Sequence, residues 1–253
     1  MEFFLVPEKE HRVLVVFRGN NLGGVLEDSD PQQTGVPPRP VKAGDPASES
    51  TAELVTNFLQ QAQKILADEA QGNTILLRGF AKHRRYPSLA ERFKLRSYCI
   101  ANYPMYRGIS RLVGMDIAPV SENLSTQIDE LERRYADYDF FFVHVKATDA
   151  TGEDGNFPAK VAAIEEVDRH IPRVTALKPE VLVITGDHST PSALRSHSWH
   201  PIPVLLHAKS ARRDRVTRFS ENDCLQGGLG MFYSKDLMSL ALAHAGRLVK
   251  FGA

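Results

Sequence analysis

The sequence predicts an α/β fold with a largely parallel sheet. Short apolar runs, which are typical of buried strands, alternate along the chain with longer segments whose apolar residues recur at helical spacing. The run at 139–145 is apolar almost throughout, which is typical of a strand covered on both faces, and the run at 180–185 is typical of another buried strand. This alternation is the pattern of strand–helix–strand units, in which successive strands lie parallel in one sheet.

The N-terminal part of the chain is expected to contain two strands, a long loop and a helix. Both strands are short apolar runs that end at an Arg-Gly pair, and the loop is rich in proline, glycine, serine and aspartate. Apolar residues at helical spacing predict the helix, which Ser50 or Thr51 can cap. The elements expected here are strands at 12–17 and 74–78, a loop at 28–50 and a helix at 51–68.

The rest of the chain is expected to alternate between strands and helices. The segments with an amphipathic pattern predict the helices, and the short apolar runs predict the strands. The expected helices lie at about 88–94, 105–113, 125–137, 157–172 and 235–246. The expected strands lie at 97–101, 139–145, 180–185 and 202–207.

Composition and charge limit the classes of function. The chain has 253 residues, of which 42% are hydrophobic and 25% charged, as is ordinary for a soluble globular protein. Its 31 basic and 31 acidic residues cancel, so the basic excess typical of nucleic-acid-binding proteins is missing. No apolar run is long enough to span a membrane, and the N-terminus does not read as a secretory signal. We therefore expect a cytoplasmic protein with no nucleic-acid or membrane partner.

The two cysteines are expected to be free. Cys99 and Cys224 lie far apart in the sequence and form neither a disulfide framework nor a CxxC metal motif. Free cysteines are among the most buried residues of folded proteins, so both thiols are expected to be buried, in a reducing compartment.

Residues that can bind a metal follow two of the predicted strands. In open α/β sheets, ligands bind beyond the carboxyl ends of the strands. Carboxylate and imidazole donors together suit zinc or manganese better than calcium, and five such donors suit a two-metal centre for phosphoryl transfer. The candidate ligands after the strands at 139–145 and 180–185 are Asp149, Glu153, Asp187, His188 and His197.

The same residues also have simpler interpretations. An aspartate such as Asp187 caps helices well, and Asp149 is of a type common in turns. A single histidine such as His197 is more often an ordinary loop residue. The metal interpretation depends on the two clusters meeting at one edge of the sheet, which follows from the predicted fold and is not independent of it.

The segment after the strand at 180–185 resembles the motif of a known family. Residues 185–191, Thr-Gly-Asp-His-Ser-Thr-Pro, are followed by His197-Ser198 and by residues 201–204, Pro-Ile-Pro-Val. This pattern is similar to the metal-binding signature of the archaeal-type cofactor-independent (2,3-bisphosphoglycerate-independent) phosphoglycerate mutases, of the alkaline phosphatase superfamily. Residues 144–155 resemble the same family, and N-terminal matches extend the resemblance over most of the chain.

The resemblance implies an isomerase of glycolysis. Members of the family interconvert 3-phosphoglycerate and 2-phosphoglycerate through a phosphoserine intermediate. They use two divalent metal ions, most often manganese, with zinc, magnesium or cobalt as alternatives. By the match, Asp187 and His188 resemble ligands of the metal that activates the serine. Asp149 and His197 resemble ligands of the metal that binds the substrate.

The resemblance also implies two domains. Residues 1–117 would form a smaller α/β domain that binds the substrate, and residues 118–253 the C-terminal part of an alkaline-phosphatase-like domain with a mostly parallel sheet. Arginine suits phosphoglycerate because its planar fork pairs with carboxylate or phosphate in bidentate fashion, although the two arginines could equally be ordinary surface charges. The residues implied to bind substrate are Arg18, Asp28, Asp30, Arg78 and Lys146.

Two departures from the family pattern bear on activity. Glu153 stands where the family has a histidine. Glutamate can still bind manganese, with an extra negative charge, but the site is damaged if this side chain points away. The family's N-terminal segment, which supplies an aspartate ligand and the nucleophilic serine, has no counterpart before Met1. No catalytic nucleophile is therefore identified, and we expect this chain alone to be inactive.

Several explanations of the missing segment are open. The chain is a truncated enzyme, one subunit of a split enzyme, or a homologue that has drifted to another role. A sheet edge left unpaired would favour an N-terminal partner chain or a homo-oligomer. Two alternative functions remain beside the mutase: a non-catalytic protein that binds a phosphorylated acid through its arginines, and a metal-dependent phosphatase of the same superfamily.

Overall fold

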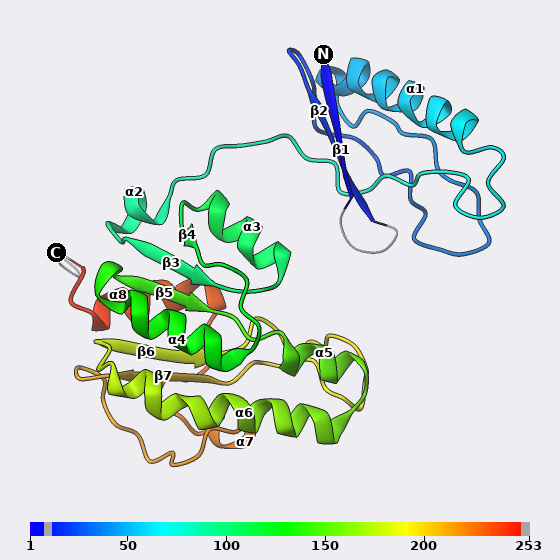
Figure 1. The fold of residues 1–253 in the computed structure, drawn as a ribbon. Coiled ribbons are helices and arrows are strands. Elements are labelled where there is room, and N and C mark those ends of the chain that lie inside the picture. The colour runs from blue at the N-terminus through cyan, green and yellow to red at the C-terminus, as the bar shows by residue number, and fades with distance from the viewer. Residues whose placement is uncertain (8–11, 249–253) are drawn as a thin grey trace. The chain divides into compact units, whose positions relative to one another are not determined.

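A computed structural model describes residues 1–7 and 12–248 and divides the chain into two compact units, Met1–Arg85 and Tyr86–Ala253 (Figure 1). This division lies well before the predicted domain boundary after residue 117. Residues 97–100 and 116–117 are strands that pair with each other, and 97–100 also pairs with a strand at 140–143. Residues 86–117 therefore belong to the second unit, because their backbone completes its sheet.

The first unit packs a two-stranded antiparallel sheet and one helix around a small core. Its elements are β1 (Glu2–Pro7), β2 (Val13–Arg18), the short 3₁₀ helix η1 (Pro46–Ser48) and α1 (Glu49–Ile65). Sequence reasoning did not predict β1, which pairs along its whole length with β2. The rings of Phe17 and Phe58 meet edge to face with centroids 5.5 Å apart. The buried core consists of Val41, Ala52, Val55 and Leu77.

The segment 74–78, predicted to be a strand, is irregular in the structure. Its backbone pairs with a serine instead of a second strand. The Leu77 N–H donates to Ser29 Oγ over 2.7 Å, and the Ser29 N–H donates to the Leu77 carbonyl over 2.8 Å. The helix α1 begins earlier than predicted, with Ser48 as its N-cap position, because η1 leads directly into it. Thr51 instead accepts a hydrogen bond from the Gly23 N–H.

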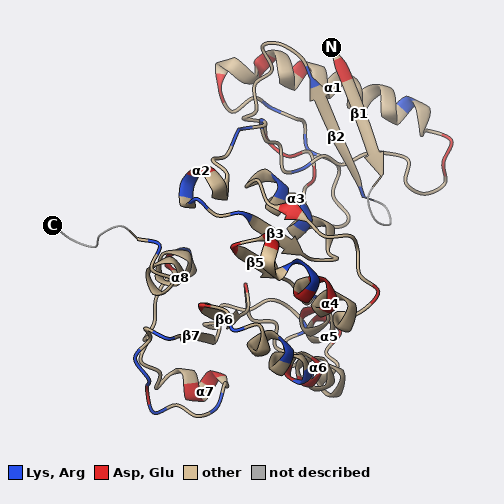
Figure 2. Ribbon diagram, turned by 60° about the vertical axis from the view of Figure 1, so that its left-hand side comes forward, with Lys and Arg blue, Asp and Glu red and all other residues tan. Residues whose placement is uncertain are grey.

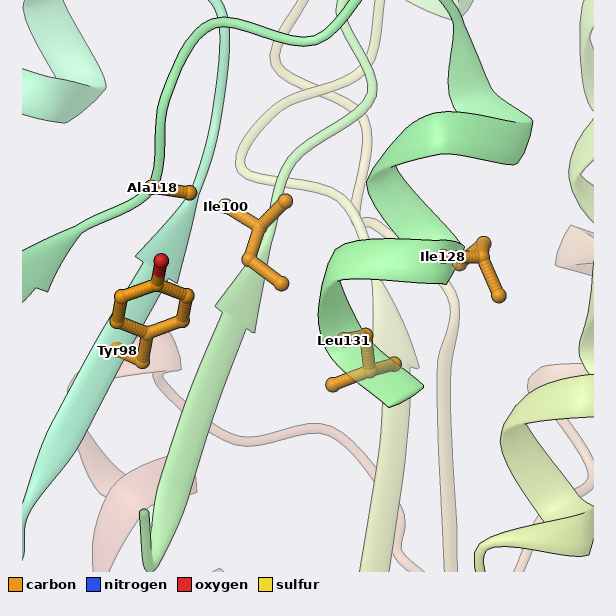
Figure 3. Close-up of a cluster of buried hydrophobic side chains, with 5 residues drawn as sticks. All are labelled: Tyr98, Ile100, Ala118, Ile128 and Leu131. Carbon is orange, nitrogen blue, oxygen red and sulfur yellow. The ribbon is translucent and has the colours of Figure 1, made fainter. Parts of the chain in front are cut away.

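The second unit is built on a three-stranded parallel sheet. The central strand β3 (Ser97–Ile100) pairs in parallel with β4 (Asp116–Ile117) on one side and with β5 (Phe140–Val143) on the other. Three helices precede or connect these strands: α2 (Leu89–Phe93), α3 (Pro104–Leu112) and α4 (Leu124–Arg134). A buried cluster joins the sheet to α4, and Figure 3 shows its members Tyr98, Ile100, Ala118, Ile128 and Leu131.

Further elements of this unit carry the polar residues singled out in the sequence. They are α5 (Ala147–Glu153), α6 (Phe157–Ala176), β6 (Val181–Thr185), β7 (Val204–Ala208), α7 (Glu221–Cys224), the 3₁₀ helix η3 (Ser234–Asp236) and α8 (Leu237–His244). Helix α5 follows β5 directly and was not predicted. Helix α6 begins at the cap Asn156, whose side chain accepts from the Ala159 N–H over 3.1 Å.

The α/β class predicted from the sequence is confirmed, with one difference in strand direction. Strands β6 and β7 pair antiparallel, from Val181↔Ala208 to Thr185↔Val204. The described residues 186–203 between them contain turns and bends and no helix, so the chain returns without the crossover that parallel strands need. The four residues of β5 are half-buried instead of fully covered.

Charged residues are distributed over the whole of the described chain. Figure 2 shows acidic and basic residues interspersed over many elements, and their formal charges sum to zero. None of the described helices is both long enough and apolar enough to cross a membrane. Both cysteines are free: Cys99 is buried in β3, as predicted, whereas Cys224 is half-buried.

Candidate metal centre

Three of the predicted ligands lie together in the second unit. Asp149, His188 and His197 each offer a donor atom, and these atoms all lie within 4.8 Å of one another. Asp149 comes from α5, immediately after β5, whereas both histidines come from the segment that follows β6. The two polar clusters that follow separate strands in the sequence therefore meet in space.

The remaining two candidates extend this cluster on either side. Oδ2 of Asp187 lies 3.4 Å from Nε2 of His188. Nε2 of His197 lies 3.5 Å from Oδ1 of Asp149 and 3.4 Å from Oε1 of Glu153. Nδ1 of His188 also lies 3.8 Å from Oδ1 of Asp149, so these contacts connect all five residues. By their shortest contacts we describe them as two adjoining groups, the 187/188 pair and the 149/153/197 group. The two imidazole rings stack between them with centroids 3.7 Å apart.

A closed loop brings His197 back to the strand end. Ser189 and Ser198 form an isolated antiparallel bridge, in which the Ser198 N–H donates to the Ser189 carbonyl over 2.9 Å. Ser189 Oγ also donates to the carbonyl of His200 over 3.2 Å. The loop closed by these bonds places His197 beside His188, although eight residues lie between them in the sequence.

Lys146 places a positive charge beside the donor atoms. Its ammonium donates a hydrogen bond to Asp149, lies 3.9 Å from Oε2 of Glu153, and sits 5.0 Å from the ring centroid of Tyr103. Burial raises the pKa of Asp149, but hydrogen bonds from Lys146 and Thr190 outweigh it and hold this pKa below its ordinary value. Burial alone would lower the pKa of Lys146, but the hydrogen bond to Asp149 outweighs burial and raises this pKa above its ordinary value. Both groups are therefore charged near neutral pH.

Hydrogen bonds around the cluster involve residues that sequence reasoning missed. The Thr190 hydroxyl donates to Oδ1 of Asp149 over 2.5 Å and lies 3.0 Å from Nδ1 of His188. The ammonium of Lys160 donates to the carbonyls of Thr148 and Thr190 over 2.9 and 2.8 Å. Thr190 belongs to the 185–191 motif that resembles the family signature, and Lys160 also lies at a position that resembles the family, but the sequence alone assigned neither residue a role.

The donor set fits a divalent cation. The cluster brings two imidazoles and one carboxylate within reach of one point, and two further carboxylates lie alongside. Such a mixed set of nitrogen and oxygen donors suits zinc and manganese. Glu153 points toward the cluster, so the substitution of glutamate for histidine leaves a potential oxygen donor in place. The side chain of Asp149 is only 14% exposed, which limits competition by water.

The residues implied to bind substrate fall into three places. In the first unit, Arg78 forms an ion pair with Asp30, in which Nη1 lies 3.6 Å from Oδ2. The side chain of Asp28 accepts a hydrogen bond from the Gly79 N–H over 2.9 Å. Arg18, at the end of β2, pairs instead with Glu2 on β1 over 3.6 Å and lies over the ring of Phe4. No contact among the described residues joins Arg18 to Asp28, Asp30 or Arg78. Lys146 lies in the second unit, at the metal-ligand cluster.

Comparison with known families covers nearly the whole chain. The family model described as "Metalloenzyme superfamily" matches residues 42–244. The model of "2,3-bisphosphoglycerate-independent phosphoglycerate mutase" matches residues 1–71. The first match includes every donor of the cluster described above.

Curated relatives extend beyond this chain. A protein of Thermotoga neapolitana named "Probable 2,3-bisphosphoglycerate-independent phosphoglycerate mutase" is 47% identical over 253 residues, covering 100% of this chain and 63% of the relative. A protein of Thermus thermophilus with the same name is 47% identical over 256 residues, with the same coverage. The chain thus spans less than two thirds of the length of these relatives.

Two solved structures share the fold. One, from Pyrococcus horikoshii, aligns with a TM-score of 0.72 and 30% identity over 83% of this chain and 61% of that chain. The other, a cofactor-independent phosphoglycerate mutase from Thermoplasma acidophilum, aligns with a TM-score of 0.70 and 26% identity over 96% of this chain and 66% of that one. The fold class and the family resemblance inferred from the sequence are both confirmed.

Proposed function

This chain belongs to the metalloenzyme superfamily, and from that premise we propose that it is the metal-binding part of a 2,3-bisphosphoglycerate-independent phosphoglycerate mutase. The named relatives and the match of residues 1–71 support the mutase within this superfamily. The single observation on which the proposal depends is the meeting of Asp149, His188 and His197. The proposed reaction interconverts 3-phosphoglycerate and 2-phosphoglycerate, an isomerisation of glycolysis in the cytoplasm.

We propose that the two donor groups hold two divalent cations, most often manganese. The 187/188 pair would hold one ion and the 149/153/197 group the other, in line with the contacts that sort these residues. Such ions supply Lewis-acid stabilisation of the phosphoryl oxygens. The contribution of the chain is to present the donors at fixed positions on α5 and on the loop closed between Ser189 and Ser198.

Cationic side chains would hold the phosphorylated acid. Lys146 lies beside the donors, and its ammonium can pair with a phosphate at the site. Arg78 is exposed and has a guanidinium oriented by Asp30, while Asp28 fixes the backbone of Gly79. We propose that Asp28 and Asp30 orient the 78–79 segment and that Arg78 binds the substrate. Arg18 would be a second, separate cation of the same unit.

The nucleophile is proposed to lie in the remainder of the whole protein. The chain spans 63% of the Thermotoga relative. Among the described residues, the serines beside the cluster, Ser189 and Ser198, direct their hydroxyls to His200 and not to the donor atoms. We propose that the phosphoryl acceptor is a serine in the part of the whole protein that this chain does not span. That part would belong to the same polypeptide or to an N-terminal partner chain.

Manganese binding and mutase activity test this function separately. The 253-residue chain is titrated with Mn²⁺ while the signal of free Mn²⁺ is followed by electron paramagnetic resonance, and its Asp149→Asn and His197→Ala variants are compared with Arg133→Ala as a control. We expect Mn²⁺ binding that the first two variants weaken at least tenfold. Absence of binding by the wild-type chain would contradict the metal centre.

Activity is assayed with 3-phosphoglycerate and Mn²⁺ for the chain alone and with the remaining segment of a relative added. We expect negligible turnover by the chain alone and restored turnover by the mixture. Robust turnover by the isolated chain would contradict the proposed placement of the nucleophile. Phosphoglycerate binding that is unaffected by Mn²⁺ would favour a non-catalytic binding protein instead.

A further inference from the structure

We propose that Thr190, fixed in place by Lys160, is a positioning residue that orients a ligand from each donor group for metal binding. The inference rests on the proposed metal centre and adds to it residues outside the donor set. It begins from one hydroxyl that lies between His188 and Asp149. Thr190 is 5% exposed, so water does not compete well for its hydrogen bonds.

The hydrogen bonds of Thr190 determine which nitrogen of His188 is free. A carboxylate only accepts hydrogen bonds, so the single hydroxyl proton of Thr190 goes to Oδ1 of Asp149, 2.5 Å away. The Thr190 oxygen must then accept from Nδ1 of His188, 3.0 Å away. A neutral His188 therefore carries its proton on Nδ1 and keeps an unprotonated Nε2, which is the nitrogen that faces Asp187.

The same hydroxyl joins the two donor groups. His188 belongs to the 187/188 pair, and Asp149 belongs to the 149/153/197 group, in which its Oδ1 also faces Nε2 of His197. A hydrogen bond from outside the donor set fixes the ring orientation of a histidine ligand and commonly raises metal affinity. Thr190 does this for one ligand of each group at once, so that ordering one group also orders the other.

Lys160 holds the hydroxyl at the required place. Its ammonium, from α6, bridges the carbonyl of Thr148, one residue before Asp149, and the carbonyl of Thr190. Gly152 allows the contact, because a Cβ at this position of α5 would overlap the Thr190 carbonyl and lie 3.0 Å from Nζ of Lys160. The Lys160 side chain thereby links a backbone carbonyl of helix α5 to a backbone carbonyl of the turn after β6.

The test compares Thr190→Val, which removes the hydroxyl at nearly constant shape, with Thr190→Ser, which retains it. Thr151→Val is the matched control, because the Thr151 hydroxyl donates only to carbonyls of its own helix. The first readout is the tautomer of His188 in the metal-free 253-residue chain, from ¹⁵N–¹H long-range spectra assigned with His188→Gln. The second is Mn²⁺ affinity, followed through the signal of free Mn²⁺.

We expect the Nδ1–H tautomer of His188 in the wild-type chain, in Thr190→Ser and in Thr151→Val, and its loss in Thr190→Val. We expect Mn²⁺ affinity to fall about 10–100-fold in Thr190→Val and to stay within about threefold of wild type in the other two. Lys160→Met should weaken Mn²⁺ binding while circular dichroism shows a folded protein.

Wild-type affinity and an unchanged tautomer in Thr190→Val would overturn the inference. An Nε2–H tautomer in the wild-type chain would overturn it without any variant, which covers the case in which Thr190→Val does not fold. Failure of the wild-type chain to bind Mn²⁺ would instead refute the metal centre, and the tautomer measurements would still test the role of Thr190.

Discussion

Replacing Gly152 by alanine tests the packing of α5 against the turn after β6. Gly152 is buried, and a Cβ at this position would overlap the carbonyl oxygen of Thr190 and lie 3.0 Å from both Nζ of Lys160 and Cγ2 of Thr190. The overlapped atom belongs to the backbone, so a side-chain rotation cannot relieve it. The helix and the turn must separate, and the bond from Lys160 to the Thr190 carbonyl is strained or lost.

The change in the free energy of unfolding is the sum of one contribution that stabilises the variant and two that destabilise it. Alanine in a helix interior is favoured over glycine by about 1 kcal/mol. Overpacking costs typically about 1–3 kcal/mol. A hydrogen bond from a charged donor contributes about 1.5–3 kcal/mol. We therefore expect Gly152→Ala to lower the free energy of unfolding by about 1.5–5 kcal/mol and to weaken Mn²⁺ binding with it.

Gly108→Ala is the matched control. Gly108 also lies inside a helix, α3 of the same unit, but a Cβ there meets nothing within 4 Å. This variant should be more stable than wild type by up to about 1 kcal/mol. Urea unfolding followed by circular dichroism gives the stabilities, and hydrogen exchange of peptides from 147–176 localises the change. A Gly152→Ala protein as stable as Gly108→Ala, with unaltered Mn²⁺ binding, would refute the close packing described here.

Further predictions concern groups elsewhere in the second unit. Hydrogen bonds from Arg96 lower the pKa of Asp139 to about 2, below its unfolded value, so this carboxylate stabilises the fold above about pH 4 and loses that effect as the pH falls toward 2. Asp139→Asn should lower the free energy of unfolding at pH 7 by only about 1 kcal/mol, because Arg96 is 64% exposed and solvent screens the pair. Urea unfolding should show a smaller difference in stability between this variant and wild type at pH 3 than at pH 7. Cys99 is fully buried and burial raises the pKa of its thiol, so it should react with a thiol reagent only as fast as the protein unfolds. Trp199, the single tryptophan, is 86% exposed and lies two residues from His197, so Mn²⁺ should quench its fluorescence in the wild-type chain and not in His197→Ala.

Each of these predictions has a result that would contradict it. An unchanged stability gap between the Asp139 variant and wild type at pH 3 would show that the carboxylate does not titrate as described. Rapid labelling of Cys99 in the folded protein would show that β3 opens locally. Equal quenching of Trp199 with and without the His197 imidazole would mean that Mn²⁺ binds away from the cluster.

Most elements of the second unit follow from local sequence patterns. The helical spacing at 157–172 corresponds to α6, and the apolar runs at 97–101 and 139–145 correspond to β3 and β5. These patterns are local, since a helix or strand must turn its own apolar residues toward a core. Helix α5 was missed because its sequence, Ala-Thr-Asp-Ala-Thr-Gly-Glu, contains turn-forming residues and has no apolar stripe.

The first unit shows where local patterns are insufficient. The run at 74–78 is apolar enough for a strand, but Ser29 satisfies the Leu77 backbone, and no ladder forms. Strand β1, at Glu2–Pro7, pairs along its whole length with β2, and the sequence of this segment alone does not specify that pairing. Strand pairing depends on distant residues, so it is visible only once the chain is folded.

The sequence by itself determined most of the helices, the strands β3 and β5 and the identity of the five candidate donors, because helical periodicity and ligand chemistry belong to individual residues and their neighbours. Only the tertiary structure decided that the donors meet and divide into two adjoining groups, and that Thr190, Lys160 and Gly152 support them. These features arise where α5, α6 and the loop closed between Ser189 and Ser198 come into contact. Contacts between segments so far apart along the chain depend on packing, which no local pattern specifies.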